Sequence, residues 1–394
     1  MKQIDVREGP RLLAGYDEGP GLTAHRARYG PLPDLDATTL VRLAKQWDIR
    51  GRGGAGFPFA IKLEGVAGKR RPVLVVNLSE GEPAAHKDAA LALGRPHLVL
   101  DGAAVVARAL GATLVHLVVP GENPRVVRAV RAAIAERSDT RLFTIHEAAD
   151  RFVAGQARAV LELMAGRPNL PVTAWQPEVF DGHRGRPTLL SNAETWAQVA
   201  VRVLRHDEDA PDTTLLTWDG ETSPMVAEVV EGTPWREVVP LDGPVLIGGY
   251  HGAWATPRML AGLAVDRDRM KQTGVPIGAG AVIPLGPGEC PVTMTARITA
   301  YLAGQSARRC GPCLNGLPAL ADAVAAVAWE RGGVARVEHL QRMVTGRGAC
   351  THPDGTARMV GSMLATFPDD VEAHAHGACA FALDAQRERE LVAR

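Results

Sequence analysis

The sequence predicts an α/β protein with a layered sheet in its first half, then a small β-rich module and a helical C-terminal region. Three observations support this. Short β-branched runs alternate with helical patterns over roughly the first 150 residues, as is typical of an α/β sheet. Short β-rich runs separated by Gly, Pro and Asp follow between residues 213 and 284, and from residue 292 the pattern is helical again. The length of 394 residues predicts two to three domains, which we place at 1–205, 206–290 and 291–394.

Individual elements follow from the apolar pattern. Residues 1–35 are rich in Gly and Pro and are expected to be loop-like. Apolar side chains at i, i+3, i+4 and i+7 predict a helix over residues 39–47. Strands are predicted over residues 73–76, 114–119, 142–145, 215–218, 226–230 and 245–247. Helices between the first three strands are predicted over residues 86–93, 97–110 and 124–136.

Composition excludes several classes of protein. Lys and Arg number 44 and Asp and Glu number 44, so the chain lacks the basic excess of a general nucleic-acid-binding protein. A membrane-spanning apolar stretch of about 18 residues and a signal-peptide apolar region are both missing, so we expect a cytoplasmic protein. The five cysteines argue against a disulfide framework and favour metal binding or free thiols.

A glycine loop follows the first predicted helix. Gly51, Gly53 and Gly56 formally match a dinucleotide fingerprint, with Gly54 between them, but that motif should follow a strand, and here a helix precedes it. Four glycines in six residues nevertheless let backbone N–H groups approach a ligand closely. The alternative is a purely structural turn.

Two polar segments are further candidates for a binding site. The first comes directly after the strand at 73–76, where open α/β sheets bind ligands, and contains Asn77, Glu80, Glu82, Lys87 and Asp88. The second is residues 187–195, which are rich in small hydrogen-bonding side chains. Each could instead be a solvated loop or a helix cap.

Together and in this order, these segments resemble the NADH- and FMN-binding flavoprotein subunit of respiratory complex I, of the NADH dehydrogenase type, and its hydrogenase and formate dehydrogenase relatives. The family pattern Gly-Arg-Gly-Gly-Ala-Gly-Phe-Pro is complete at residues 51–58, and the family lysine is Lys62. The family's Asn-Ala-Asp-Glu-x-Glu-Pro pattern corresponds to residues 77–83, and its Pro-Thr-x-x-Asn-x-Glu-Thr pattern to residues 187–195. The similarity extends over about nine-tenths of the chain.

The resemblance implies a fold and a set of cofactors. The fold would be a Rossmann-like flavin domain, a small β-grasp module of the soluble-ligand-binding type and a C-terminal helical iron–sulfur domain. The cofactors would be FMN and a [4Fe–4S] cluster, with NAD(H) as substrate and Phe57 near the nicotinamide. No side chain need act as a general acid, because the flavin carries the redox chemistry. Residues implied at the FMN and nicotinamide site are Gly51, Gly53, Gly54, Gly56, Phe57, Lys62, Asn77, Glu80, Glu82, Asn192 and Thr195.

The chain also departs from the family pattern. The second motif has Leu78 and Ser79 in place of Ala and Asp, and the family's Gly-Glu-Glu segment reads Gly155-Gln156-Ala157. An aromatic residue that the family places soon after Lys62 is missing.

The cysteines show a similar partial match. The family holds its cluster with Cys-x2-Cys-x2-Cys and a distant fourth Cys, but here the first position is Ala307. The resemblance therefore implies Cys310, Cys313 and Cys350 as ligands, with Cys379 as the substitute for the fourth thiolate. Zinc binding and structural thiols without metal are the alternatives. Weaker ligand candidates are His352, His374 and His376, and Cys290 is interpreted as a packed thiol.

The sequence leaves two main functions open, and a flavoprotein that lacks the cluster is a weaker third. The first is an electron-transfer flavoprotein, similar to an NADH dehydrogenase subunit, which passes electrons from NAD(P)H to a ferredoxin-like or membrane-bound partner. The second is a non-catalytic scaffold or assembly subunit that has lost the cluster and the flavin. Ser79, Ala157 and Ala307 stand where the family has functional side chains and favour the second.

Overall fold

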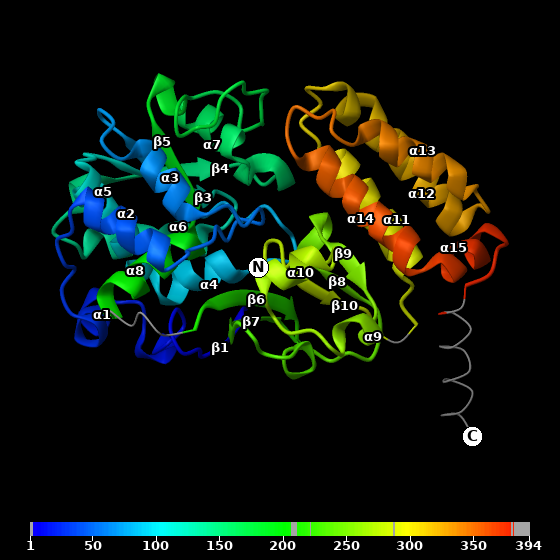
Figure 1. The fold of residues 1–394 in the computed structure, drawn as a ribbon, viewed down its shortest axis with the longest axis horizontal. Helices are drawn as coiled ribbons and strands as arrows, with labels where there is room; N and C mark the ends of the chain where they lie inside the picture. Colours follow the sequence, from blue (N-terminus) through cyan, green and yellow to red (C-terminus); the bar gives the residue numbers. More distant parts are fainter. Residues whose placement is uncertain (1–2, 206–210, 221, 287, 380, 382–394) are drawn as a thin grey trace. The chain divides into compact units, whose positions relative to one another are not determined.

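Figure 1 shows the fold of the chain in a computed structural model. The structure describes residues 3–205, 211–220, 222–286, 288–379 and 381. Contacts divide the chain into two compact units. The first comprises Met1–Glu231 with Gly278–Gly280, and the second comprises Gly232–Ile277 with Ala281–Arg394. Our three-part division into domains stays a prediction.

The first unit contains the predicted α/β sheet. Its four strands are parallel, in the order β4-β3-β2-β5. Their bounds are β2 (Val73–Asn77), β3 (Val115–Pro120), β4 (Phe143–Ala148) and β5 (Thr188–Asn192). The chain steps outward from β2 to β4 and then returns to the other side of β2, so the strand order reverses between β2 and β5. Such a reversal opens a crevice at the carboxyl ends of the strands.

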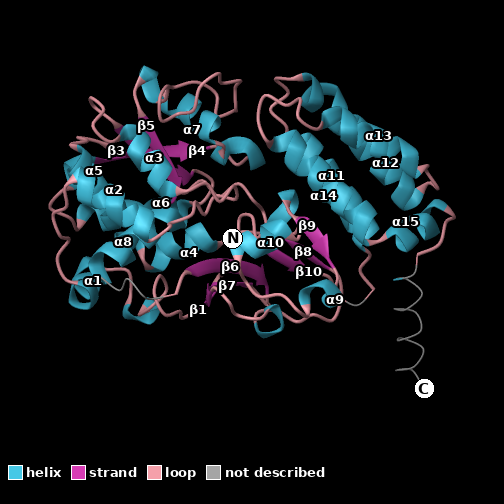
Figure 2. Ribbon diagram, in the orientation of Figure 1, coloured by secondary structure: helices cyan, strands magenta, loops and turns pink. Residues whose placement is uncertain are grey.

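Helices accompany the strands of this sheet (Figure 2). They are α2 (Ala37–Gln46), α3 (Phe59–Val66), α4 (Lys87–Gly94), α5 (Pro96–Leu110), α6 (Pro124–Ala135), α7 (Ala157–Met164) and α8 (Ala193–Arg205). The helices predicted from apolar spacing are confirmed, with ends that differ by one or two residues. Close packing of α5 on α8 requires Gly102, because a Cβ atom there would lie 1.9 Å from the Trp196 carbonyl oxygen.

The N-terminal region is not the loop that its composition predicted. It contains β1 (Asp5–Arg7) and α1 (Leu22–Tyr29). The β1 strand pairs in parallel with β7 (Pro224–Val230), which pairs with β6 (Thr213–Asp219). The buried Glu228 carboxylate on β7 accepts the backbone N–H groups of Arg11, Leu12 and Leu13 at 2.9–3.0 Å. These partners lie more than 200 residues apart in sequence, so local composition could not reveal them.

The second unit combines a small antiparallel sheet with helices. The sheet has the order β10-β8-β9, from β8 (Val245–Ile247), β9 (Ala253–Ala255) and β10 (Val282–Pro284). The short helices are α9 (Pro257–Leu260) and α10 (Arg267–Gln272). The long helices are α11 (Pro291–Gly304), α12 (Leu317–Trp329), α13 (Val334–Val344), α14 (His352–Thr366) and α15 (Pro368–Ala375). Short 3-10 turns in the two units are Tyr16–Glu18, Thr140–Leu142, Phe152–Gly155, His183–Gly185, Trp235–Glu237 and Gly249–His251.

A π-helical turn, Pro312–Gly316, leads directly into α12. Together they form the one unbroken helix among the described residues that is long and apolar enough to cross a membrane; the α4–α5 pair, bent by 91°, would be a second. The α12 helix packs against α11, α13 and α15. Core helices of water-soluble domains pass the same test of length and apolarity.

Three histidines lie together in the first unit. His116 Nδ1 on β3 is 2.9 Å from His146 Nε2 on β4, and the His116 and His183 rings are 5.3 Å apart. Burial lowers the pKa of all three side chains, and the neighbouring His146 and His183 help to bring that of His116 to about 3. Arg184 and Arg186 lower the pKa values of His116 and His183 further.

This cluster predicts loss of stability in mild acid. The folded-state pKa of His116 lies below the unfolded value of about 6.5, so the unfolded chain binds more protons between these values. Stability that is complete above about pH 6.5 is therefore lost progressively as the pH falls toward 3. We expect His116→Gln to show a smaller drop in Tm than the wild type between about pH 7.5 and pH 5. The control is the same change at exposed His339 on α13; equal drops in wild type and His116→Gln would contradict the assignment.

Candidate functional site

The crevice between β2 and β5 carries polar side chains from both strand ends. Asn77 ends β2 and Asn192 ends β5, and the two are register partners in the parallel pair. The sequence placed both in one site, and the structure brings them together. The Asn192 Nδ2 group also donates to the Asn77 carbonyl oxygen at 3.4 Å.

Asn192 belongs to a buried charge cluster formed with Lys87, Asp88 and Glu194. The Lys87 Nζ atom lies 2.7 Å from Asp88 Oδ1, 2.9 Å from Asn192 Oδ1 and 3.2 Å from Glu194 Oε2. Asn192 Nδ2 in turn donates to Asp88. Burial opposes the charge on Lys87, but the carboxylates of Asp88, Glu194 and Glu80 outweigh it and raise the pKa of Lys87. The cluster thus ties the start of α4 to the start of α8 across the crevice.

Glu80 holds the loop that follows β2. Its carboxylate accepts the backbone N–H groups of Asp88 and Ala89 at 2.7 and 2.9 Å, which caps α4. Its backbone is left-handed, with φ of 38°, a strained conformation for a residue other than glycine. Burial, followed by the charge of Asp88, raises the pKa of Glu80 to about 8. The carboxylate of Glu80 is thus used to cap α4, and Glu80 shapes the crevice through its backbone conformation.

The glycine loop lies against the β5 side of the crevice. Gly51 N–H donates to the Phe57 carbonyl oxygen at 2.9 Å, which closes the loop, and Arg52 N–H donates to the buried Thr195 hydroxyl at 3.0 Å. Gly54 and Gly56 have φ of 108° and 65°, which other residues rarely adopt.

The loop leaves room for a ligand at Gly53. A Cβ atom added there would meet only the Asn192 Cβ within 4 Å, at 3.5 Å. Open space lined by glycine backbone beside the Asn192 side chain fits a flat, polar-edged cofactor such as FMN. Glu82, also predicted at the site, is half-buried, and its carboxylate accepts Ala84 N–H at 3.3 Å.

The departures from the family pattern meet at Asn77. Its Nδ2 group donates to the Gly155 carbonyl oxygen at 2.8 Å, and its Oδ1 atom accepts the Ser79 hydroxyl at 2.6 Å. A Cβ atom at Gly155 would lie 2.7 Å from the Ser79 Oγ atom. The Asn77 amide is therefore oriented by two of the segments in which this chain differs from the family pattern.

Lys62 has a partner that the sequence did not reveal. Its Nζ atom donates to Glu178 Oε1 at 2.9 Å and to the Leu190 carbonyl oxygen at 3.1 Å. It also lies 5.8 Å from the centre of the Phe57 ring, which is 47% exposed. Glu178 lies in an irregular segment 116 residues from Lys62, so no local pattern could identify it. The charged pair Lys87-Asp88, in contrast, stands at the start of an apolar helix, a signal that could have marked it as buried.

Three of the four predicted cluster ligands gather in the second unit. Cys313 lies in the π-helical turn and is 2% exposed. Burial, then the neighbouring thiols of Cys310 and Cys350, raise its pKa to about 12, while the Ala307 backbone N–H donates to its sulfur. Three thiols and a backbone donor at the position of the missing ligand fit an iron–sulfur cluster with one iron held by another group.

Cys379 does not join these three cysteines. Its sulfur, Cys290 Sγ and His374 Nε2 lie within 4.8 Å of one another, and His374 Nδ1 is 2.9 Å from the Ala328 carbonyl oxygen near the end of α12. Cys313 stands before the start of α12, and the helical rise from residue 313 to 328 is about 20 Å. This far exceeds an iron–sulfur or zinc–sulfur bond of about 2.3 Å. Cys290, interpreted above as only a packed thiol, belongs to this second group.

Comparisons with known proteins identify both cofactor regions. Residues 44–201 match the family model described as the Nuo51 FMN-binding domain. Residues 293–374 match the model described as the NADH-ubiquinone oxidoreductase-F iron-sulfur binding region. The resemblance and the mixed α/β fold inferred from the sequence are thereby confirmed.

Full-length relatives show the same relationship. An NADH-quinone oxidoreductase subunit of Rhizobium meliloti is 28% identical over 411 residues, covering 95% of this chain and 96% of the relative. A subunit of the NADP-reducing hydrogenase of Solidesulfovibrio fructosivorans is 24% identical, covering 85% and 76%. A chain of a crystal structure of NAD+-reducing [NiFe]-hydrogenase in the H2-reduced state aligns with a TM-score of 0.80 and 25% identity, covering 100% of this chain and 72% of that one. The chain therefore belongs to the family of flavoprotein subunits of NADH-quinone oxidoreductases and related hydrogenases.

Proposed function

We propose that this chain is an electron-transfer flavoprotein that carries electrons from NAD(P)H, through FMN and a [4Fe–4S] cluster, to another redox protein. The observation that carries the proposal is the open glycine loop at the crevice between β2 and β5. The match of residues 44–201 to an FMN-binding family model supports it. When bound, FMN supplies the exchange between a two-electron hydride donor and a one-electron acceptor.

The residues of the crevice have separable roles in this proposal. Gly53 and Gly54 would present backbone to the flavin, and Asn192 would offer its side chain beside them. Thr195, Glu80 and the Lys87 cluster hold the loops in place. Phe57 would present its exposed ring to the nicotinamide, steadied by the Lys62 ammonium group. In the second unit, Cys310, Cys313 and Cys350 would hold the cluster.

The partner is proposed to be another redox subunit, either ferredoxin-like or part of a membrane-bound complex to which this chain is peripheral. Similar proteins are named as subunits of an NADH-quinone oxidoreductase and of a hydrogenase. The five free cysteines agree with residence in the reducing cytoplasm, which is part of the same proposal.

The competing function is the non-catalytic scaffold. Ala307 lacks a thiol, and the Lys62 charge is already compensated by Glu178. The two functions differ in cofactor content, which a single sample can decide.

We expect protein purified without oxygen to contain FMN and iron, with flavin bands and a broad iron–sulfur absorbance that bleach when NADH or NADPH is added. The reason is that the hydride donor reduces the flavin, which passes electrons to the cluster. An absorption spectrum with flavin and iron assays before and after addition measures this. A colourless sample after anaerobic reconstitution would establish the scaffold instead.

The flavin assignment predicts the effect of Gly53→Val. The new side chain has room in the fold, since the nearest atom to its Cβ is 3.5 Å away, but it fills the open space beside Asn192. We expect the affinity for FMN to fall by about 5- to 150-fold, from overlap worth about 1–3 kcal/mol, with little change in Tm. Gly262→Val is the matched control, because a Cβ atom there meets nothing within 4 Å. Fluorescence titration of stripped protein with FMN makes the measurement, and equal affinity in both variants would remove the loop from the site.

The cluster assignment predicts that Cys313→Ser loses iron and keeps flavin. Cys313 belongs to the second unit, whereas the glycine loop belongs to the first, so only one cofactor should respond. Iron and flavin contents are measured on the same anaerobic sample. Iron at the wild-type level would exclude Cys313 as a ligand.

A further inference from the structure

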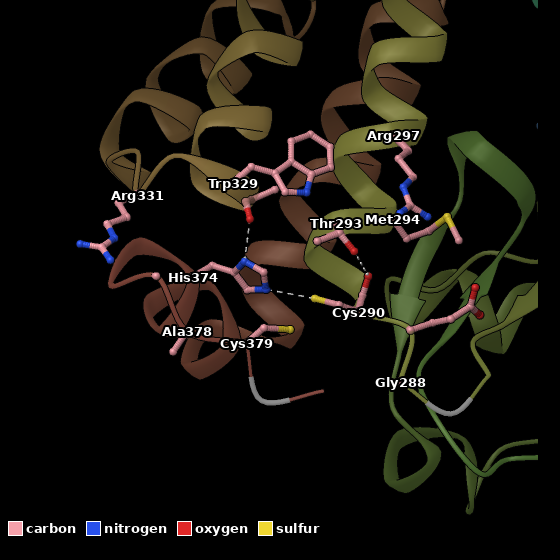
Figure 3. A pocket seen from close by; sticks show the side chains of 13 residues that line it. Gly288, Cys290, Thr293, Met294, Arg297, Trp329, Arg331, His374, Ala378 and Cys379 are labelled. Atoms are coloured by element: carbon pink, nitrogen blue, oxygen red, sulfur yellow. Dashed lines mark hydrogen bonds between the residues drawn. The ribbon is translucent and has the colours of Figure 1, made fainter. Parts of the chain in front are cut away.

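A second group of soft metal ligands lies in the second unit, beside a cavity of about 580 Å³ (Figure 3). Cys290 Sγ, His374 Nε2 and Cys379 Sγ all lie within 4.8 Å of one another. They come from three places in the chain: the N-terminal cap of α11, helix α15 and the segment after it. Nothing in the proposed electron path uses them.

The histidine is oriented as a ligand. Its Nδ1 atom is 2.9 Å from the Ala328 carbonyl oxygen, so the ring proton belongs on Nδ1 and Nε2 carries the lone pair. That lone pair is directed at Cys290 Sγ, 3.2 Å away. A carbonyl acceptor on the far nitrogen is the usual outer support of a metal-bound imidazole. His374 is 7% exposed, which restricts the ring to this orientation.

The first cysteine lies at the N-terminal end of α11. Cys290 is 6% exposed, and the backbone N–H groups of Val292 and Thr293 donate to its sulfur at the start of α11. Burial outweighs these donors and raises the pKa of Cys290 to about 11, so a metal ion would have to displace the thiol proton when it binds.

We propose that Cys290, His374 and Cys379 bind one zinc ion, with solvent from the cavity as the fourth ligand. Thiolate and imidazole are the donors that zinc prefers in tetrahedral sites. Tetrahedral bonds of about 2.3 Å to sulfur and 2.0 Å to nitrogen place ligand atoms about 3.5–3.8 Å apart. The Cys290 Sγ–His374 Nε2 distance of 3.2 Å would lengthen slightly, and all separations in the group are within 4.8 Å, so only small shifts are needed to reach this geometry. Arg297 and Arg331 also line the cavity, so an anion could replace the solvent ligand.

The zinc ion would join parts of the chain that are distant in sequence. Cys290 and His374 are 84 residues apart, and the ion would bind the segment after α15 to the start of α11. It would lie about 20 Å along α12 from Cys313, so the two metal centres would be filled independently.

The test measures zinc and iron on the full chain purified without oxygen, in wild type and two double variants. We expect about one zinc per chain in the wild type, and a loss of at least about tenfold in Cys290→Ser with Cys379→Ser, with iron and flavin unchanged. The matched control, Cys310→Ser with Cys313→Ser, should lose iron and keep zinc. This opposite pattern separates the zinc site from the proposed electron-transfer function, since either can fail alone.

A spectroscopic test guards against effects on folding. Cobalt(II) added to the Cys310→Ser and Cys313→Ser protein should give visible bands of a tetrahedral ion and a near-ultraviolet sulfur-to-metal band. Cys379→Ser in that background should weaken the near-ultraviolet band while circular dichroism stays unchanged, because Cys379 is half-buried and lies outside α15. Any one of three results would overturn the proposal. They are wild-type protein that holds no zinc after supplementation, zinc retained in the variant with Cys290→Ser and Cys379→Ser, and a Cys290–Cys379 disulfide in the anaerobic protein.

Discussion

The first unit depends on the buried ammonium group of Lys87. This side chain is 2% exposed, and a lone cation at such a site would be strongly unfavourable. Asp88, Asn192 and Glu194 surround it, so the start of α4, the end of β5 and the start of α8 must remain together. Removing one member of a buried pair typically costs about 3–5 kcal/mol, because the other charge stays buried. The crevice between β2 and β5 keeps its shape for this reason.

The same constraint divides the polar residues of the crevice into two kinds. Glu80 and Thr195 bond to backbone N–H groups and fix the loops, whereas Gly53 and the exposed ring of Phe57 leave surface for a ligand. Lys62 shares features of both kinds. Glu178 balances its charge, as for a residue that fixes a loop, while its ammonium group lies near the exposed Phe57 ring. A family motif that matches letter by letter thus contains residues with different physical tasks. Only contacts distinguish them.

Helix α12 separates the cysteines into two groups. Cys310, Cys313 and Cys350 lie at its start, and Cys290 and Cys379 lie at its other end with His374. The rise of the helix makes the groups independent, because no thiol can serve both ends. Five cysteines that look like one incomplete ligand set in the sequence are therefore two sets of different composition.

The sequence alone determined the α/β class, helices α2, α4, α5 and α6, six of the ten described strands, the glycine loop and the two polar segments of the candidate site. Those features depend on local periodicity and on motifs whose residues are close in the chain. The structure decided what depends on long-range contacts. Composition suggested a loop for residues 1–35, but pairing of β1 with β7 and the Glu228 carboxylate organise that region. Cys379 was expected to complete the cluster, but the length of α12 places it with Cys290 and His374 instead. Distances between segments remote in sequence are set by packing of the whole chain, which no local pattern records.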